Sequence, residues 1–127
     1  MTVYKRELLF GRWIGNSYDQ QGNEMVEHAH FFADGSFEFC FMTHDEQGYL
    51  VEQVIEMGDW GLVGDIHFTV TKNELIDENI YAADLANEDN YHAYKVIQLS
   101  PDSFKYQHII TEESFILKRV IDNIGHC

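Results

Sequence analysis

Two histidines of this chain stand where they could bind a metal ion. His28 and His30 lie in a run that alternates apolar and polar residues, so both side chains would project from one face of a strand. Such pairs bind zinc in some β-proteins, although no third ligand follows from the spacing of the other five histidines. We therefore favour ordinary strand histidines and predict no metal, with a zinc or haem site as the alternative.

A second candidate for chemistry is the pair formed by Glu27 and His108, which belong to two separate runs. Burial would raise the pKa of the Glu27 carboxyl and make it useful for proton transfer near neutrality. An isomerase- or decarboxylase-like enzyme could use such a pair inside an aromatic cavity. Alternatively, Glu27 lies in water at a rim and His108 bonds a neighbouring hydroxyl. We favour a protein that is not an enzyme and assign no catalytic residues.

Motifs for covalent catalysis or cofactor binding are missing from the sequence. It contains no Gly-x-Ser-x-Gly, no phosphate-binding glycine loop and no Cys-x-x-Cys, and we predict no cofactor. Two cysteines do not make a disulfide framework. We expect Cys40 to be buried and Cys127 to be mobile. Neither has a basic neighbourhood that would activate a thiol, unless His126 does so for Cys127.

The elements that must position these residues are short strands separated by turn residues. Asp34-Gly35, His44 to Gly48 and Ser100-Pro101-Asp102-Ser103 are turn signals. The period-two runs between such signals predict an all-β domain spanning residues 1–127. The expected strands are Leu8–Tyr18, Glu24–Ala33, Ser36–Thr43, Tyr49–Met57, Trp60–Gly64, Ile66–Val70, Tyr91–Leu99, Phe104–Thr111 and Ser114–Ile121.

Residues 73–90 depart from this meander, because they hold six acidic residues and no basic one. Thr71 followed by Glu74 just before an apolar pair is typical of a helix N-terminus. We predict a short helix and an acidic loop here, inserted between later strands. The insertion is either a solvated connection or a lid, with its apolar residues over the barrel mouth. Those residues are Leu75, Ile76, Ile80 and Tyr81.

Composition limits the possible partners. The formal net charge of −14 is unfavourable for binding nucleic acid or an anionic membrane surface. Hydrophobic residues make up 45% of the chain, but no apolar run approaches the ~20 residues of a membrane span. The first residues also lack the apolar stretch of a signal peptide, so we expect a cytoplasmic location. Whether the chain forms a homodimer stays open.

Several landmarks occur in a recognisable order, and each is weak alone. Together they resemble the small bacterial lipocalin-like (calycin) domains over residues 8–121. This resemblance implies an up-and-down antiparallel barrel of about eight strands. It also implies that Trp13 and Arg119 form a cation–π pair at the closed end. The landmarks are Gly11-x-Trp13, Phe31-x-x-Asp34-Gly35-x-Phe37, Gly58-x-Trp60 with Gly64-Asp65, Tyr94-x-Val96-x-x-Leu99-x-x-Asp102, and Arg119.

The family spacing directs Phe31 and Phe37 inward, and alternation then assigns the other strands. Met25, Glu27, Ala29, Phe39, Phe41, Trp60, Ile66 and Phe68 would face in, while Phe104, Tyr106, His108 and Ile110 would share one face. His28, His30 and Phe32 would face out, unless a bulge near Phe32 reverses the strand.

We therefore predict that the barrel interior binds a small apolar or aromatic molecule. The alternatives are the enzyme with Glu27 and His108, and a filled barrel that serves as a protein interaction module. The predicted ligand-binding residues are Phe39, Phe41, Trp60, Phe68, Tyr94, Tyr106 and His108.

Overall fold

The computed structural model describes residues 1–121. Within this range the chain is almost entirely β-structure, as the alternating pattern predicts. The two helical segments are short 3-10 turns, and neither could span a lipid bilayer. The elements are η1 (Arg6–Leu9), β1 (Gly11–Tyr18), β2 (Glu24–Phe31), β3 (Ser36–His44), β4 (Leu50–Val63), β5 (Ile66–Ile76), β6 (Asn79–Ala82), η2 (Glu88–Asn90), β7 (Tyr91–Leu99), β8 (Ser103–His108) and β9 (Ser114–Arg119).

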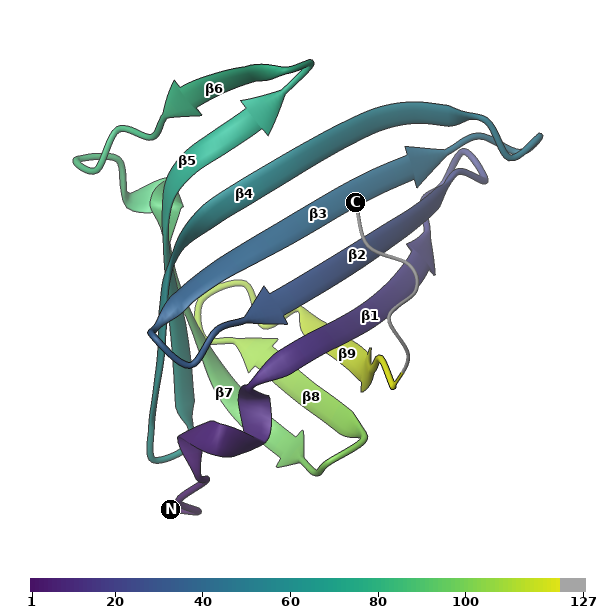
Figure 1. The fold of residues 1–127 in the computed structure, drawn as a ribbon. Helices are drawn as coiled ribbons and strands as arrows, with labels where there is room; N and C mark the ends of the chain where they lie inside the picture. The colour runs from purple at the N-terminus through teal and green to yellow at the C-terminus, as the bar shows by residue number, and fades with distance from the viewer. Residues whose placement is uncertain (122–127) are drawn as a thin grey trace.

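Eight of the described strands form a closed antiparallel barrel, and β6 stands outside it (Figure 1). The strands follow one another around the wall, with β4 paired to β5 and β5 paired to β7. Closure comes from pairing of β1 with β9, where Trp13 lies opposite Arg119 and Ile14 opposite Lys118. The predicted up-and-down barrel is confirmed.

Strand β4 runs unbroken through a region where we predicted two strands with a break at Gly58. The register against β5 shifts between Met57 and Gly58, which is a bulge that bends the strand without ending it. A Cβ atom at Gly58 would lie 1.9 Å from the carbonyl oxygen of Val70. Only glycine therefore allows the two strands to approach so closely at this bend.

The helix predicted after Thr71 does not form. Strand β5 continues through this residue to Ile76, and a tight turn at Asp77 and Glu78 leads into β6. Both turn residues have positive φ, 50° and 67°, which is the backbone of a two-residue hairpin turn. Side chains of the proposed lid are exposed on β6, so the lid prediction is wrong: Ile80 is 69% exposed and Tyr81 54%.

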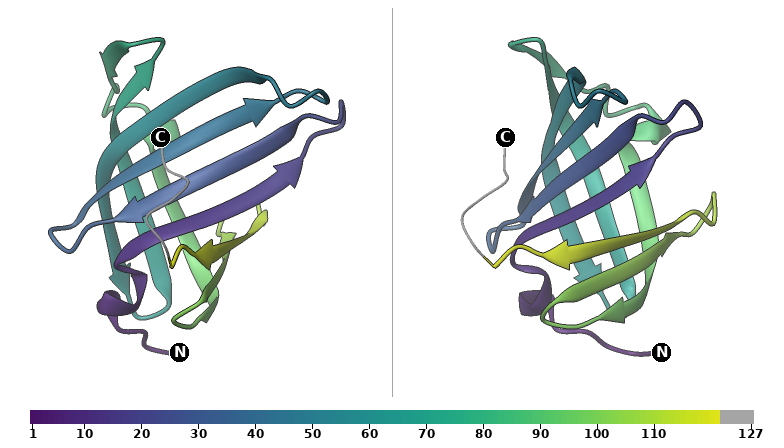
Figure 2. Two further views of the ribbon diagram at one scale, coloured as in Figure 1. Left: turned by 45° about the vertical axis from the view of Figure 1, so that its right-hand side comes forward. Right: turned by 90° about the vertical axis from the view of Figure 1, so that its right-hand side faces the viewer.

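One end of the barrel is closed by η1, which lies across it beside the N-terminus (Figure 2). Trp13 and Leu9 are fully buried there, and the Trp13 indole N–H donates to the Leu9 carbonyl at 3.0 Å. The guanidinium of Arg119 lies 4.2 Å from the Trp13 ring and donates to the carbonyls of Phe10 and Leu8. The predicted Trp13–Arg119 pair is therefore confirmed.

Candidate functional site

An internal cavity of about 190 Å³ lies inside the barrel and is the candidate site. Its wall combines aromatic rings with carboxyl, hydroxyl and imidazole groups, and it contains no lysine or arginine. The barrel is thus neither filled throughout nor purely apolar inside. The lining residues are Glu27, Ala29, Phe31, Phe39, Phe41, Glu56, His67, Thr69, Thr71, His92, Tyr94, Tyr106 and Phe115.

Strands β2 and β3 supply their cavity residues by simple alternation. Glu27, Ala29 and Phe31 line the cavity as predicted, whereas Met25 at the start of β2 is 46% exposed. The neighbouring strand contributes Phe39 and Phe41. The same alternation directs the intervening residues of β2 to the outer face.

The outward orientation predicted for His28 and His30 is therefore confirmed. The His30 ring stacks on Phe32, with 3.9 Å between the ring centroids. Within residues 1–121 no group of three or more histidine, cysteine, aspartate or glutamate side chains could hold a metal ion. Cys40 is buried and is not a free thiol, and Cys127 lies outside the described residues.

The face assigned to β5 is the opposite of the predicted one. We expected Ile66 and Phe68 inside, but His67 and Thr69 line the cavity, and Phe68 is 40% exposed. The Phe68 ring covers Gly61 on β4, where a Cβ atom would lie 2.2 Å from it. The alternating apolar residues of β5 thus lie on the outer surface of the barrel, and the buried His67 lies on its inner surface.

Only some of the predicted ligand-binding residues line the cavity. Trp60 is buried below the cavity, with its ring centroid 5.3 Å from that of Phe31. His108 ends β8 and bonds to a cavity residue, while Ile110, predicted on its face, is 78% exposed in the following turn. Those that line the cavity are Phe39, Phe41, Tyr94 and Tyr106.

Two carboxyl groups of the cavity have raised pKa values. Burial and the nearby Glu56 raise the pKa of Glu27 to about 7, against a donated hydrogen bond from Tyr106. Burial also raises the pKa of Glu56, which accepts a 3.0 Å hydrogen bond from the Thr71 hydroxyl. Near neutral pH, Glu27 is therefore divided between its neutral and ionised forms.

The tyrosines of the wall keep their protons. Burial, followed by the charge of Glu27, raises the pKa of both Tyr94 and Tyr106. The rings meet edge to face, with centroids 5.0 Å apart. Their hydroxyls remain neutral donors beside the carboxyl groups.

Hydrogen bonds show which ring nitrogen carries the proton in His67 and in His108. Burial lowers the pKa of His67 to about 4, so its ring is neutral, and its Nδ1 donates to the Gly61 carbonyl at 3.2 Å. The Nδ1 of His108 accepts from the backbone amides of Ile110 and Thr111. The proton of the neutral His108 ring is then on Nε2, which donates to His92 Nδ1 at 3.2 Å.

The acid–base pair of Glu27 and His108 is not formed. Among the described residues, Glu27 interacts with Tyr106 and Glu56, and His108 is held by His92 and by the turn that follows β8. The second carboxyl of the cavity is thus Glu56, which the sequence reasoning missed. Its position opposite Phe39 in the β3–β4 register could have revealed it, because Glu56 lies within the predicted strand Tyr49–Met57.

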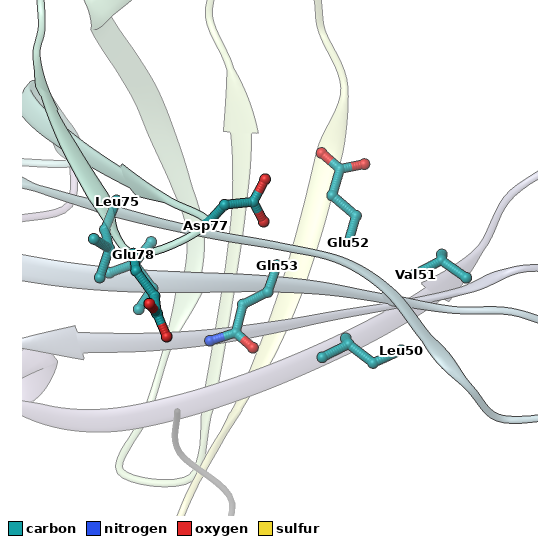
Figure 3. Close-up of a pocket in the computed structure, with 8 residues that line it drawn as sticks. Leu50, Val51, Glu52, Gln53, Leu75, Asp77 and Glu78 are labelled. Atoms are coloured by element: carbon teal, nitrogen blue, oxygen red, sulfur yellow. The ribbon is translucent and has the colours of Figure 1, made fainter.

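A second, larger hollow of about 440 Å³ lies between the start of β4 and the β5–β6 turn (Figure 3). Leu50 and Val51 on its border are 51% and 58% exposed. Asp77 and Glu78 border it on the turn. No aromatic residue lines this hollow, and it is more open to solvent than the internal cavity. The internal cavity is therefore the better candidate site.

Comparison with solved structures supports the architecture. A lipocalin-like protein from Bacteroides uniformis matches with a TM-score of 0.52 and 18% sequence identity. The match covers 89% of this chain and 99% of the other. No family model and no curated protein matches the sequence. The predicted lipocalin-like resemblance is thereby confirmed at the level of the fold.

Proposed function

We propose that this protein binds a small molecule with one apolar ring inside its barrel. The observation that carries the proposal is the cavity between Glu27 on β2 and Tyr94 on β7. Its volume of about 190 Å³ slightly exceeds that of the roughly 150 Å³ apolar cavities that bind benzene. A single ring therefore fits, whereas a long lipid chain does not.

Burial of a ring against the cavity wall supplies the affinity. The Phe39, Phe41 and Phe115 side chains offer apolar surface to the ligand. Each Å² of apolar surface that binding removes from water contributes roughly 25 cal/mol to the free energy of binding. The hydroxyls of Tyr94 and Tyr106 provide the few polar groups that orient a ligand. Such a division between apolar wall and sparse polar groups is typical of small-molecule sites.

The proposal is tested by filling the cavity. Ala29 lines it and is 2% exposed, so Ala29→Leu places extra carbon atoms inside. We expect this variant to lose at least tenfold in affinity for benzyl alcohol, measured by calorimetry. Ala93→Leu is the matched control, because Ala93 pairs with the outward Phe68. If the parent chain binds benzyl alcohol and the two variants bind it equally well, the proposal is overturned.

A further inference from the structure

The charges inside the cavity are unbalanced. Glu27 and Glu56 both line it, and the charge of Glu56 acts on Glu27 strongly enough to help raise its pKa. No lysine or arginine belongs to the wall. Glu27 lines the cavity, so its side chain lies next to any molecule held there.

Neighbouring titratable groups do not compensate for this charge. His67 is held neutral by burial, and Tyr94 and Tyr106 keep their protons. Beyond the wall, Glu74 acts on Glu56 and Glu113 acts on Tyr94, and both add negative charge. His92 is tied by its Nδ1 to His108. The cavity is thus a negative site with donors but no fixed cation.

We propose that the ligand is a small organic cation, a protonated amine carried on one ring, whose ammonium group lies between the carboxyls of Glu27 and Glu56. This inference rests on the proposed function and specifies its ligand. The ammonium supplies the charge that the wall lacks, and two carboxylates offer it charge-assisted hydrogen bonds. An anion would meet like charge, and a neutral ring would leave both acids uncompensated.

The aromatic rings of the wall favour the same ligand. The rings of Phe39, Phe41 and Phe115 line the cavity, and an aromatic ring can attract a cation as well as an apolar ring, because its π-system is negative above and below the plane. The closed end already contains such contacts: Arg119 lies over Trp13, and Arg6 lies 4.8 Å from the Trp60 ring. In the cavity the rings are present and the cation is absent from the wall.

Binding of a cation is coupled to ionisation of Glu27. A positive charge beside the carboxyl favours its ionised form, so binding at pH 7 releases the proton that a fraction of the molecules carry there. The affinity for an amine that stays protonated therefore rises between pH 5 and pH 8. The affinity for a neutral ring of the same shape does not rise.

The experiment compares benzylamine, benzyl alcohol and benzoate by calorimetry at pH 8 and pH 5. We expect benzylamine to bind at least tenfold more tightly than benzyl alcohol at pH 8, with benzoate weakest. Repeating the titration in phosphate and Tris buffers at pH 7 should show release of a fraction of a proton for benzylamine alone.

Glu27→Gln and Glu56→Gln each test the position of the ammonium group. Both should lower the affinity for benzylamine at least tenfold and leave that for benzyl alcohol within threefold. Glu52→Gln is the matched control, since Glu52 lies on β4 but is exposed outside the cavity. Tight binding of benzyl alcohol with no preference for the amine would overturn the cation inference alone. Failure of all three probes would overturn the proposed function as well.

Discussion

At the closed end of the barrel, Arg119 lies 4.2 Å from Trp13 and donates to backbone carbonyls. In the cavity, by contrast, Glu27 and Glu56 lie among aromatic rings with no lysine or arginine in the wall. Both regions are rich in aromatic side chains, but only the closed end contains a cation, Arg119, that interacts with those rings. In the cavity no lysine or arginine side chain stabilises the ionised carboxyl groups, so their ionisation is disfavoured.

The closed end mainly stabilises the fold, whereas we propose that the cavity recognises a ligand. Fully buried Trp13, Leu9 and Phe104 pack at the closed end without accessible surface. The cavity gives up part of that packing to leave space, and its buried acid lowers the stability of the folded state at neutral pH. Removal of a packed ring at the closed end should consequently lower the stability, whereas removal of the buried acid from the cavity should raise it.

The largest effect is expected at the closed end. Trp13→Ala should lower the free energy of unfolding by about 3–5 kcal/mol, because it empties a fully buried site and removes the ring that Arg119 covers. Phe41→Ala should cost clearly less, since that ring faces existing empty space. Urea denaturation followed by fluorescence measures both. Equal losses would contradict the distinction between the two regions.

The next effect is a gain in stability. The folded pKa of Glu27 is raised from 4.5 to about 7, so the unfolded chain loses this proton first and stability falls as pH rises between these values. Glu27→Gln removes that loss and should stabilise the protein by about 3 kcal/mol at pH 8, with little change at pH 4.5. Thermal unfolding across this range, with Glu52→Gln as control, measures the gain. A destabilised variant at pH 8 would show that the carboxylate is compensated after all.

His67 is expected to give the smaller effect, with the opposite sign. Its folded pKa is lowered from 6.5 to about 4, so the unfolded chain takes up the proton first and stability falls as pH drops below 6.5. The loss should reach about 2 kcal/mol by pH 5. His67→Gln should remove this slope, whatever it does to the overall level. An unchanged slope in urea titrations at pH 5 and pH 6.5 would contradict the burial of a neutral ring.

The closed end was predictable because the ordered landmarks, each weak alone, together resemble lipocalin-like domains, and that resemblance implies the Trp13–Arg119 pair. Trp13 follows Gly11 in the first run and Arg119 lies in the last, and strand order then brings them together. Five of the aromatic wall residues were also predicted, namely Phe31, Phe39, Phe41, Tyr94 and Tyr106.

The face of β5 was not predictable in the same way. Ile66, Phe68 and Val70 alternate as a buried face would, but Phe68 packs against Gly61 on the outside. The buried alternative, His67, becomes acceptable only because the Gly61 carbonyl accepts a hydrogen bond from its ring N–H. Both contacts depend on the pairing of β5 with β4, which no local pattern encodes.

The mistaken helix has a similar origin. Thr71 and Glu74 match a capping box, but the Thr71 hydroxyl donates to Glu56 across the barrel wall. The turn at Asp77 and Glu78 also lacks the glycine that usually marks a two-residue hairpin. Strand pairing outweighed a local helix signal that is only moderately strong.

The seam between β1 and β9 has a consequence for the folding reaction. The hydrogen bond from Arg119 to the Phe10 carbonyl joins residues 109 positions apart, whereas the other pairs of neighbouring barrel strands are close in the chain. We therefore expect the hairpins to form early and the pairing of β1 with β9, which joins the two ends of the chain, to form last. Contacts that form after the transition state slow unfolding without speeding folding. We therefore expect Arg119 to act mainly on the rate at which the closed barrel unfolds.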